Sequence, residues 1–301
     1  MNVEMAYLLG MICGNGSVQR KVNETIISIS IPHKKLETED FTDVQLYVKA
    51  SIVDIRSKIE PLIGYELQFI QQKRDTILSF CKPNTDYLIR EILRFIGNAT
   101  SHDNIKLNND FFSFSTDEKR YFLRGFADVT GYIRRSNAFI EKHKHRVYLE
   151  IPHNWFLVID ICNLLKSIDI PVQTIDWGHP NMRDGNCKKY NNGQHNFWKK
   201  EHQIKIWANE FLPIGFSIIH KNRSLQNFAN ELIDDYNNKN KNISLFTHRY
   251  YWETKDQTRI KQEHPSENDI FIPSEIRGKH FDSWKEIASE LGYGEFSKCK
   301  K

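Results

Sequence analysis

Acidic, basic and histidine side chains gather near the C-terminal end of the sequence. His264 and Glu267 stand in His-Pro-Ser-Glu-Asn, and His280 and Asp282 stand in Ile-Arg-Gly-Lys-His-Phe-Asp. Carboxylates and imidazoles can move protons, and the neighbouring arginine and lysine can neutralise a phosphate. The pattern predicts an active-site or phosphate-binding loop. A solvated surface loop has the same composition and is the alternative.

Two basic stretches are candidates for contacts with nucleic-acid phosphates. Residues 134–146 and residues 188–205 each carry five Lys or Arg and one Glu. In the first stretch, His143 and His145 alternate on one face of an expected strand and suit phosphate or base contacts. An ordinary solvated surface is the alternative for both stretches. The net charge of +4 is too small to identify a partner by itself.

Composition indicates a packed globular protein of one large domain or two. The chain has 301 residues, of which 40% are hydrophobic and 12% aromatic. The five cysteines are scattered and form no C-x-x-C pair, which argues against a disulfide framework and against a zinc ribbon. We find no secretory apolar segment and no apolar run of about 18 residues. We therefore expect an intracellular protein, in the cytoplasm or in a nucleoid or organelle, with no membrane partner.

Two segments of the chain repeat one pattern. Residues 7–18 and residues 122–133 are each an apolar helical run with an internal glycine, and each run ends at a glycine and enters a strand. Gly10 and Gly14 lie on one face of the first expected helix, and Gly125 is the counterpart of Gly10. Small residues let two helix backbones approach closely, so we expect these glycines at a buried helix–helix contact.

The layout that follows these runs is also repeated. Residues 31–33 and residues 151–153 both read Ile-Pro-His, and each triplet follows a strand-like run. Proline stops strand pairing, and the apolar residues beyond it have helical spacing. The expected helices and strand pairs are residues 44–62, 66–70 with 76–81 and 85–96 in the first copy, and residues 155–168, 172–177 with 203–207 and 221–236 in the second.

The near-constant spacing of the two copies indicates a structural duplication. The two closing glycines are 115 residues apart, and the two triplets are 120 residues apart. We expect an α+β fold of two pseudo-symmetric αββαββα halves, residues 1–100 and residues 101–236. A polar linker follows, and a C-terminal extension, residues 246–301, is too short for a strong core of its own. We expect it to pack on the body.

The repeated pattern, at residues 8–16 and 123–131, resembles the motif of the LAGLIDADG homing-endonuclease family, present twice as in its single-chain members. The resemblance covers about residues 4–236. It implies that the paired helices lie between two saddle-shaped sheets, which straddle the DNA major groove. In the family, carboxylates at the helix ends bind divalent metal ions, which activate water for cleavage of both strands.

The resemblance places the two metal-binding positions at Asn15 and Thr130. Their amide and hydroxyl groups are neutral and therefore weak ligands for Mg²⁺. Asp128 fills the family's other acidic position, which is usually structural. Lys82 and Lys221 lie near the basic residue that the family places just before the third helix of each half, close to the scissile phosphate.

Three explanations of the missing carboxylates stay open. Asn15 can be an engineered isosteric replacement of Asp, the protein can have lost cleavage and kept binding, or catalysis can use other groups. The other groups are Asp128 and the C-terminal acids Glu267 and Asp282, with His264 or His280 as proton carriers.

The resemblance also implies double-stranded DNA as the partner, because long polar side chains on the strands can read base edges in the major groove. The expected DNA-binding residues are Gln19, Arg20, Lys21, Lys73, Arg134, Arg135, His143, His145 and Lys205. We expect a monomeric site-specific endonuclease of homing or restriction type, with a non-standard active site that uses Mg²⁺ or another divalent metal. The alternative is a DNA- or RNA-binding protein without nuclease activity, such as a regulator or an intron-splicing cofactor.

Overall fold

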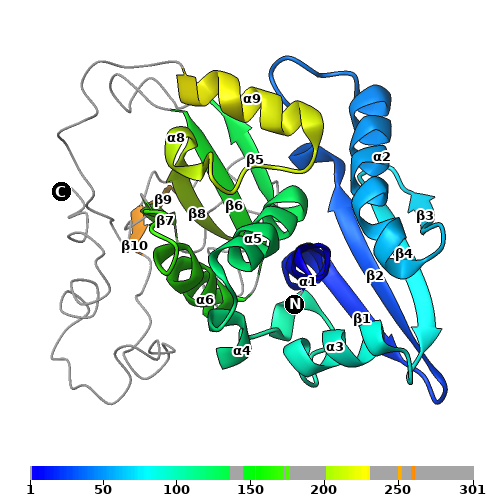
Figure 1. The fold of residues 1–301 in the computed structure, drawn as a ribbon. Coiled ribbons are helices and arrows are strands. Elements are labelled where there is room, and N and C mark those ends of the chain that lie inside the picture. The colour runs from blue at the N-terminus through cyan, green and yellow to red at the C-terminus, as the bar shows by residue number, and fades with distance from the viewer. Residues whose placement is uncertain are drawn as a thin grey trace, which may run out of the picture.

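The computed structural model describes residues 2–135, 145–152, 154–172, 174–176, 201–230, 250–252 and 259–261. Two four-stranded antiparallel sheets lie on either side of a central pair of helices (Figure 1). The strand orders are β1-β2-β4-β3 and β5-β6-β8-β7, so the second sheet repeats the topology of the first. The α+β fold of two pseudo-symmetric αββαββα halves is therefore confirmed.

The first half has the element order expected from the sequence. Its elements are α1 (Val3–Asn15), β1 (Gly16–Arg20), β2 (Glu24–Pro32), the 3-10 helix η1 (His33–Lys35), α2 (Val44–Ile63), β3 (Gln68–Gln71), β4 (Asp75–Pro83) and α3 (Tyr87–Ile96). Residues along β2 alternate between buried and half-buried, as one helix-covered face of a sheet requires. The Asp43 carboxylate caps the start of α2, and Gly64, with a φ of 87°, ends it.

The second half repeats the order of its main helices and strands, with three short helices added. Its elements are η2 (His102–Asn104), α4 (Asn109–Phe112), α5 (Thr116–Thr130), β5 (Gly131–Arg134), β6 (Arg146–Pro152), α6 (Trp155–Lys166), β7 (Thr174–Asp176), β8 (Glu201–Trp207), α8 (Ala208–Phe211) and α9 (Ile219–Asn230). Ser115 and Glu118 form a capping box at the start of α5. Beyond these elements, β9 (Tyr250–Trp252) pairs with β10 (Arg259–Lys261).

The contact between α1 and α5 forms the centre of the molecule (Figure 1). A Cβ atom added to Gly10 would lie 1.9 Å from the Phe122 carbonyl oxygen, and one added to Gly125 would lie 2.0 Å from the Tyr7 carbonyl oxygen. Only glycine allows the two backbones to approach so closely. The predicted helix–helix contact at these two glycines is confirmed.

Some expectations are changed or lie outside the described residues. The third helix of the second half begins at Ile219, so Lys221 lies inside it and not before it. The linker, residues 237–245, and most of the extension, residues 246–301, are outside the described residues, and the boundaries of the halves at residues 100 and 236 stay predictions. Among the helices that the structure describes, none has the length and apolar character needed to cross a membrane.

Candidate nucleic-acid interface and helix-end site

Asn15 and Thr130 are the last residues of the two central helices, and each donates its side-chain hydrogen bond to the backbone. The Asn15 Nδ2 donates to the Ser30 carbonyl oxygen at 2.8 Å. The Thr130 Oγ1 donates to the Phe126 carbonyl oxygen at 2.7 Å, within its own helix. Both side chains therefore stabilise the ends of the helices.

The strand register identifies the residues that lie opposite these two helix ends. Gly16 is paired with Ile29, and Gly131 is paired with Leu149. One step further along each antiparallel pair, Asn15 stands opposite Ser30 and Thr130 stands opposite Glu150. The second half thus has a carboxylate across from the helix end. We did not expect Glu150 from the sequence; the only sign of it is its place directly before the second Ile-Pro-His triplet.

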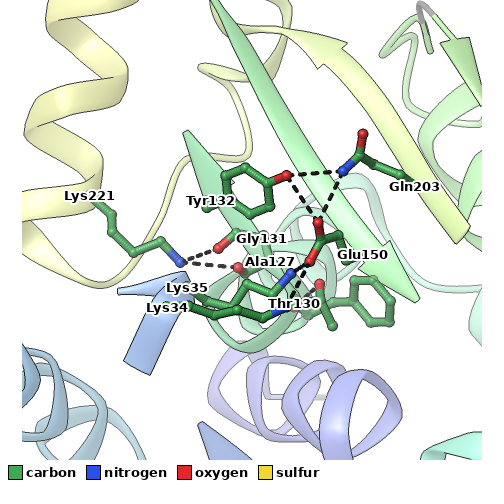
Figure 2. A network of polar contacts seen from close by, with 10 residues as sticks. Lys34, Lys35, Ala127, Thr130, Gly131, Tyr132, Glu150, Gln203 and Lys221 are labelled. Atoms are coloured by element: carbon green, nitrogen blue, oxygen red, sulfur yellow. Dashed lines mark hydrogen bonds and ion pairs between the residues drawn. The ribbon is translucent and has the colours of Figure 1, made fainter. Parts of the chain in front are cut away.

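Glu150 is buried and both of its carboxylate oxygens are engaged (Figure 2). Its Oε1 accepts hydrogen bonds from the Tyr132 hydroxyl and the Gln203 Nε2, each at 3.0 Å. Its Oε2 forms an ion pair with the Lys35 ammonium and lies 3.6 Å from the Lys34 Nζ. Both lysines come from η1 in the first half, so the network joins the two halves beside the helix ends.

Asp128 and Lys221 hold the end of α5 in place. The Asp128 Oδ2 accepts from the Tyr7 hydroxyl at 2.8 Å and from the Ser217 backbone N at 3.0 Å. The Lys221 Nζ donates to the carbonyl oxygens of Ala127, Asp128 and Gly131 at 3.3, 3.2 and 2.8 Å; Figure 2 draws the first and last of these bonds. A cation among the last carbonyls of a helix interacts favourably with its dipole.

Burial shifts the pKa values of this pair in opposite directions. It raises the pKa of the Asp128 carboxyl, and the charge of Lys221 opposes that shift. It lowers the pKa of Lys221 to about 8, and the charge of Asp128 opposes that shift. Because Lys221 is fully buried and bonded to backbone, it is not presented to a DNA phosphate as we expected. Lys82, on β4, instead forms a partly buried ion pair with Asp86 at 3.0 Å.

The helix-end residues do not fit a divalent metal ion. Asn15 and Thr130 are neutral, and the charge of Glu150 is matched by Lys35. Asp128 is fully buried: its Oδ2 accepts two hydrogen bonds, and its Oδ1 has no hydrogen-bond partner among the described residues. Hard divalent cations need anionic oxygen ligands. Within the described ranges, no group of three or more His, Cys, Asp and Glu residues that could hold a metal ion is found. The other candidate catalytic residues, Glu267, His280 and Asp282, lie outside those ranges.

Three of the expected DNA-binding residues lie on the sheet faces that point away from the helices. Gln19 alternates with the buried Val18, and Arg134 alternates with the buried Ile133. Lys205 lies between the buried Ile204 and Ile206 and is therefore on the face away from the helices, where it is half-buried beside its register partner Tyr148. Lys21 and Lys73 are exposed in the β1–β2 and β3–β4 turns, where Lys21 pairs with Glu24.

The remaining expected DNA-binding residues lie elsewhere. Arg20 has the same strand parity as Val18, and its guanidinium donates to the Gly97 carbonyl at the end of α3, so it is on the helix side. The Arg135 Nε bonds the Glu39 carboxylate at 2.8 Å, which links the halves. The His145 ring lies 4.6 Å from the Phe228 ring, and His143 is outside the described residues. Arg20 is on the helix side because it is two residues after the buried Val18, and alternate residues of a strand lie on the same face.

Aromatic rings and cations form a platform on the face of the second sheet that points away from the helices. On it Tyr148 is buried, Tyr132 and Lys205 are half-buried, and Arg134 is exposed. The rings of Tyr132 and Tyr148 are stacked, with centroids 5.1 Å apart and planes 6° apart. The Arg134 guanidinium lies 5.1 Å from both centroids, and the Lys205 Nζ lies 5.9 Å from the Tyr148 centroid. We call these four residues the tyrosine platform. Their cations are held by the π faces of the rings.

Comparison with known proteins yields structural likenesses only. No family model matches the sequence, and no curated protein matches it. The fold is similar to that of I-DmoI in complex with DNA and Mn, at 14% identity and a TM-score of 0.37, covering 77% of this chain and 100% of that chain. It is similar to LAGLIDADG homing endonuclease I-GzeII in complex with its DNA target, at 8% identity and a TM-score of 0.37, covering 77% and 85%.

A third likeness is to full-length DUF199/WhiA from Thermatoga maritima, at 15% identity and a TM-score of 0.39, covering 78% of this chain and 63% of that chain. At these identities and TM-scores the comparisons say nothing about individual residues. The class of this protein, a single chain with two αββαββα halves, is established by its own strand order and helix pair.

Proposed function

We propose that this chain binds double-stranded DNA across the faces of its two sheets that point away from the helices. The observation that carries the proposal is the tyrosine platform, in which the exposed Arg134 and the half-buried Lys205 lie over the stacked rings of Tyr132 and Tyr148. Long cationic side chains on strands can contact phosphates and base edges, and the B-DNA major groove admits a two-stranded ribbon. The major groove of A-form RNA is too narrow to admit a two-stranded ribbon, so this mode of binding favours DNA over RNA as the partner.

The two halves contribute unequally to this surface. The face of the first sheet away from the helices carries Ser28 and Ser79, which are register partners, beside Gln19. Ile26, Ile70 and Ile77 lie between these polar side chains on the same face. Its cations, Lys21 and Lys73, are at the turns. The second sheet therefore supplies the charge on the strands themselves, and we expect it to contribute more of the affinity for phosphates.

Cleavage is a separate matter from binding. The endonuclease prediction, of homing or restriction type, requires a metal site, and the helix-end residues do not fit one. We therefore propose binding as the function of the described body and assign no cleavage step to Asn15, Thr130 or Asp128. Incubation of the whole chain with plasmid and Mg²⁺ or Mn²⁺ tests whether residues elsewhere supply the missing acids.

Fluorescence anisotropy with a duplex pool of random sequence tests the binding proposal. Affinity should fall steeply between roughly 50 and 200 mM salt, and Arg134→Gln and Lys205→Gln should each weaken binding and reduce the salt slope by about 1. Arg94→Gln on α3 and Lys58→Gln on α2 are matched controls outside the sheets and should bind like the parent. Binding that ignores salt, or equal losses in all four variants, would contradict the proposal.

A further inference from the structure

The Lys35–Glu150 ion pair is buried and crosses between the halves. The Lys35 side chain is 5% exposed and the Glu150 side chain 9%. Lys35 ends η1, which contacts α5, and Glu150 is on β6, opposite the last residue of α5 in the register. A buried carboxylate without a partner is strongly unfavourable, so Glu150 needs a positive charge at this point.

Lys34 is the obvious rival for this role, and its surroundings argue against it. Its Nζ lies 3.6 Å from the same Oε2 atom, but its side chain is 62% exposed. Water screens an exposed charge, so Lys34 contributes little to neutralising a buried carboxylate. The Lys35 ammonium also lies 4.8 Å from the centroid of the Tyr132 ring, whose hydroxyl donates to the other oxygen of Glu150. Lys35 is thus enclosed by the same network.

We infer that the Lys35 ammonium is the resident cation of the helix-end site and keeps divalent ions away from Glu150. A divalent ion that used Glu150 would have to displace Lys35 from Oε2 and remain beside its charge. The other oxygen is already taken by Tyr132 and Gln203. Removal of the ammonium leaves the Oε2 atom of Glu150 without its cation, and Mg²⁺-type ions use as few as one or two protein carboxylates, with water in several of the other positions. This inference goes beyond the proposed function and does not depend on DNA.

Thermal unfolding of the whole chain in EDTA and in millimolar Mn²⁺ tests the inference. The parent should have the same Tm in both. Lys35→Met should lower Tm in EDTA, because Glu150 loses its partner, and Mn²⁺ should raise the Tm of this variant by at least about 2 °C. Lys34→Met is the matched control and should show neither effect. In the double variant Lys35→Met/Glu150→Gln the Mn²⁺ effect should vanish, and Tm in EDTA should exceed that of Lys35→Met alone.

Each result decides for or against the inference. If Lys35→Met is unfolded in EDTA, its refolding on addition of Mn²⁺ supports the inference. If Mn²⁺ does not refold it although the double variant is folded, the inference is contradicted. A parent whose Tm rises with Mn²⁺ and loses that rise on Glu150→Gln would show that Lys35 does not exclude the metal. Equal Mn²⁺ responses of Lys34→Met and Lys35→Met would also overturn the assignment.

Discussion

At the scale of single residues, the second half buries several charged groups, and each is bonded differently. Glu150 and Lys221 are surrounded by donors and acceptors, respectively. Asp160 on α6 is 2% exposed, and its Oδ2 accepts from the Leu107 backbone N at 2.9 Å. Its Oδ1 has no hydrogen-bond partner among the residues that the structure describes. Burial accordingly raises the pKa of Asp160 to about 7.

Asp160→Asn should therefore stabilise the protein at pH 8. An unfolded aspartate titrates near pH 4, so between about pH 4 and 7 the folded chain holds the extra proton and stability falls as the pH rises. The amide cannot ionise, and its oxygen can still accept from Leu107. We expect a gain on the order of 1–3 kcal/mol at pH 8 and little change at pH 4. Urea unfolding at both pH values measures this, with the exposed Asp40→Asn as control; equal effects at both values would contradict it.

Lys221 has the opposite dependence on pH. Its folded pKa of about 8 is below that of an unfolded lysine, about 10.4, so the unfolded chain binds more protons in this window and stability rises with pH. The slope contributed by this residue can reach about 1.4 kcal/mol per pH unit. Lys221→Met should remove that rise between pH 8 and 10, measured by urea unfolding. The surface variant Lys58→Met should keep it, and an unchanged slope in Lys221→Met would show that the lysine is not neutralised on folding.

At the scale of elements, the closeness of α1 and α5 depends on individual glycines. A Cβ at Gly10 meets the Phe122 carbonyl oxygen at 1.9 Å, which is backbone and cannot move aside. A Cβ at Gly14 meets the Val129 Cγ2 at 2.6 Å and the Thr130 Cγ2 at 3.0 Å, which are side-chain methyl groups. The same helix thus offers a strict glycine and a more tolerant one.

Gly10→Ala and Gly14→Ala should differ in stability although they make the same change in one helix. Each gains about 1 kcal/mol of helix propensity. At Gly10 the backbone clash should outweigh this gain by about 1–3 kcal/mol or more, because the helices must separate. At Gly14 repacking of methyl groups should bring the net change closer to zero. Chemical denaturation measures both, and equal costs would mean that the helices are not held as closely as the structure has them.

The helix pair and the strand order could be predicted because they leave periodic signals in the sequence. Gly10 and Gly125 recur in matching positions, and each Ile-Pro-His triplet marks the end of a strand. Contacts between the halves leave no such signal: Lys35 meets Glu150 only when both halves are folded and correctly placed. The direction of Arg20 also required the register, because one residue along a strand changes the face.

At the scale of the whole molecule, the two halves are joined by more than the helix pair. Arg135 bonds Glu39, and the Ile219 backbone N donates to the Asp54 Oδ2 at 2.8 Å, which ties α9 to α2. These links and the Lys35–Glu150 pair fix the two sheets relative to each other without residues beyond Asn230. A rigid relation between the sheets is what a surface that spans two stretches of one groove requires.

A chain ending at residue 236 should therefore fold and bind DNA as the whole chain does. The buried hydrophobic residues that the structure describes all lie between Met5 and Phe228, so this truncation keeps both sheets and the α1–α5 contact. We expect one cooperative unfolding transition and a salt slope of duplex binding within about 1 of that of the whole chain. Calorimetry and anisotropy measure these, and an unfolded or non-binding product would show that residues 237–301 complete the body.

The same two chains also locate any cleavage activity. If the whole chain cleaves DNA and the truncated chain binds DNA without cleaving it, the catalytic acids lie after residue 236, where Glu267 and Asp282 are.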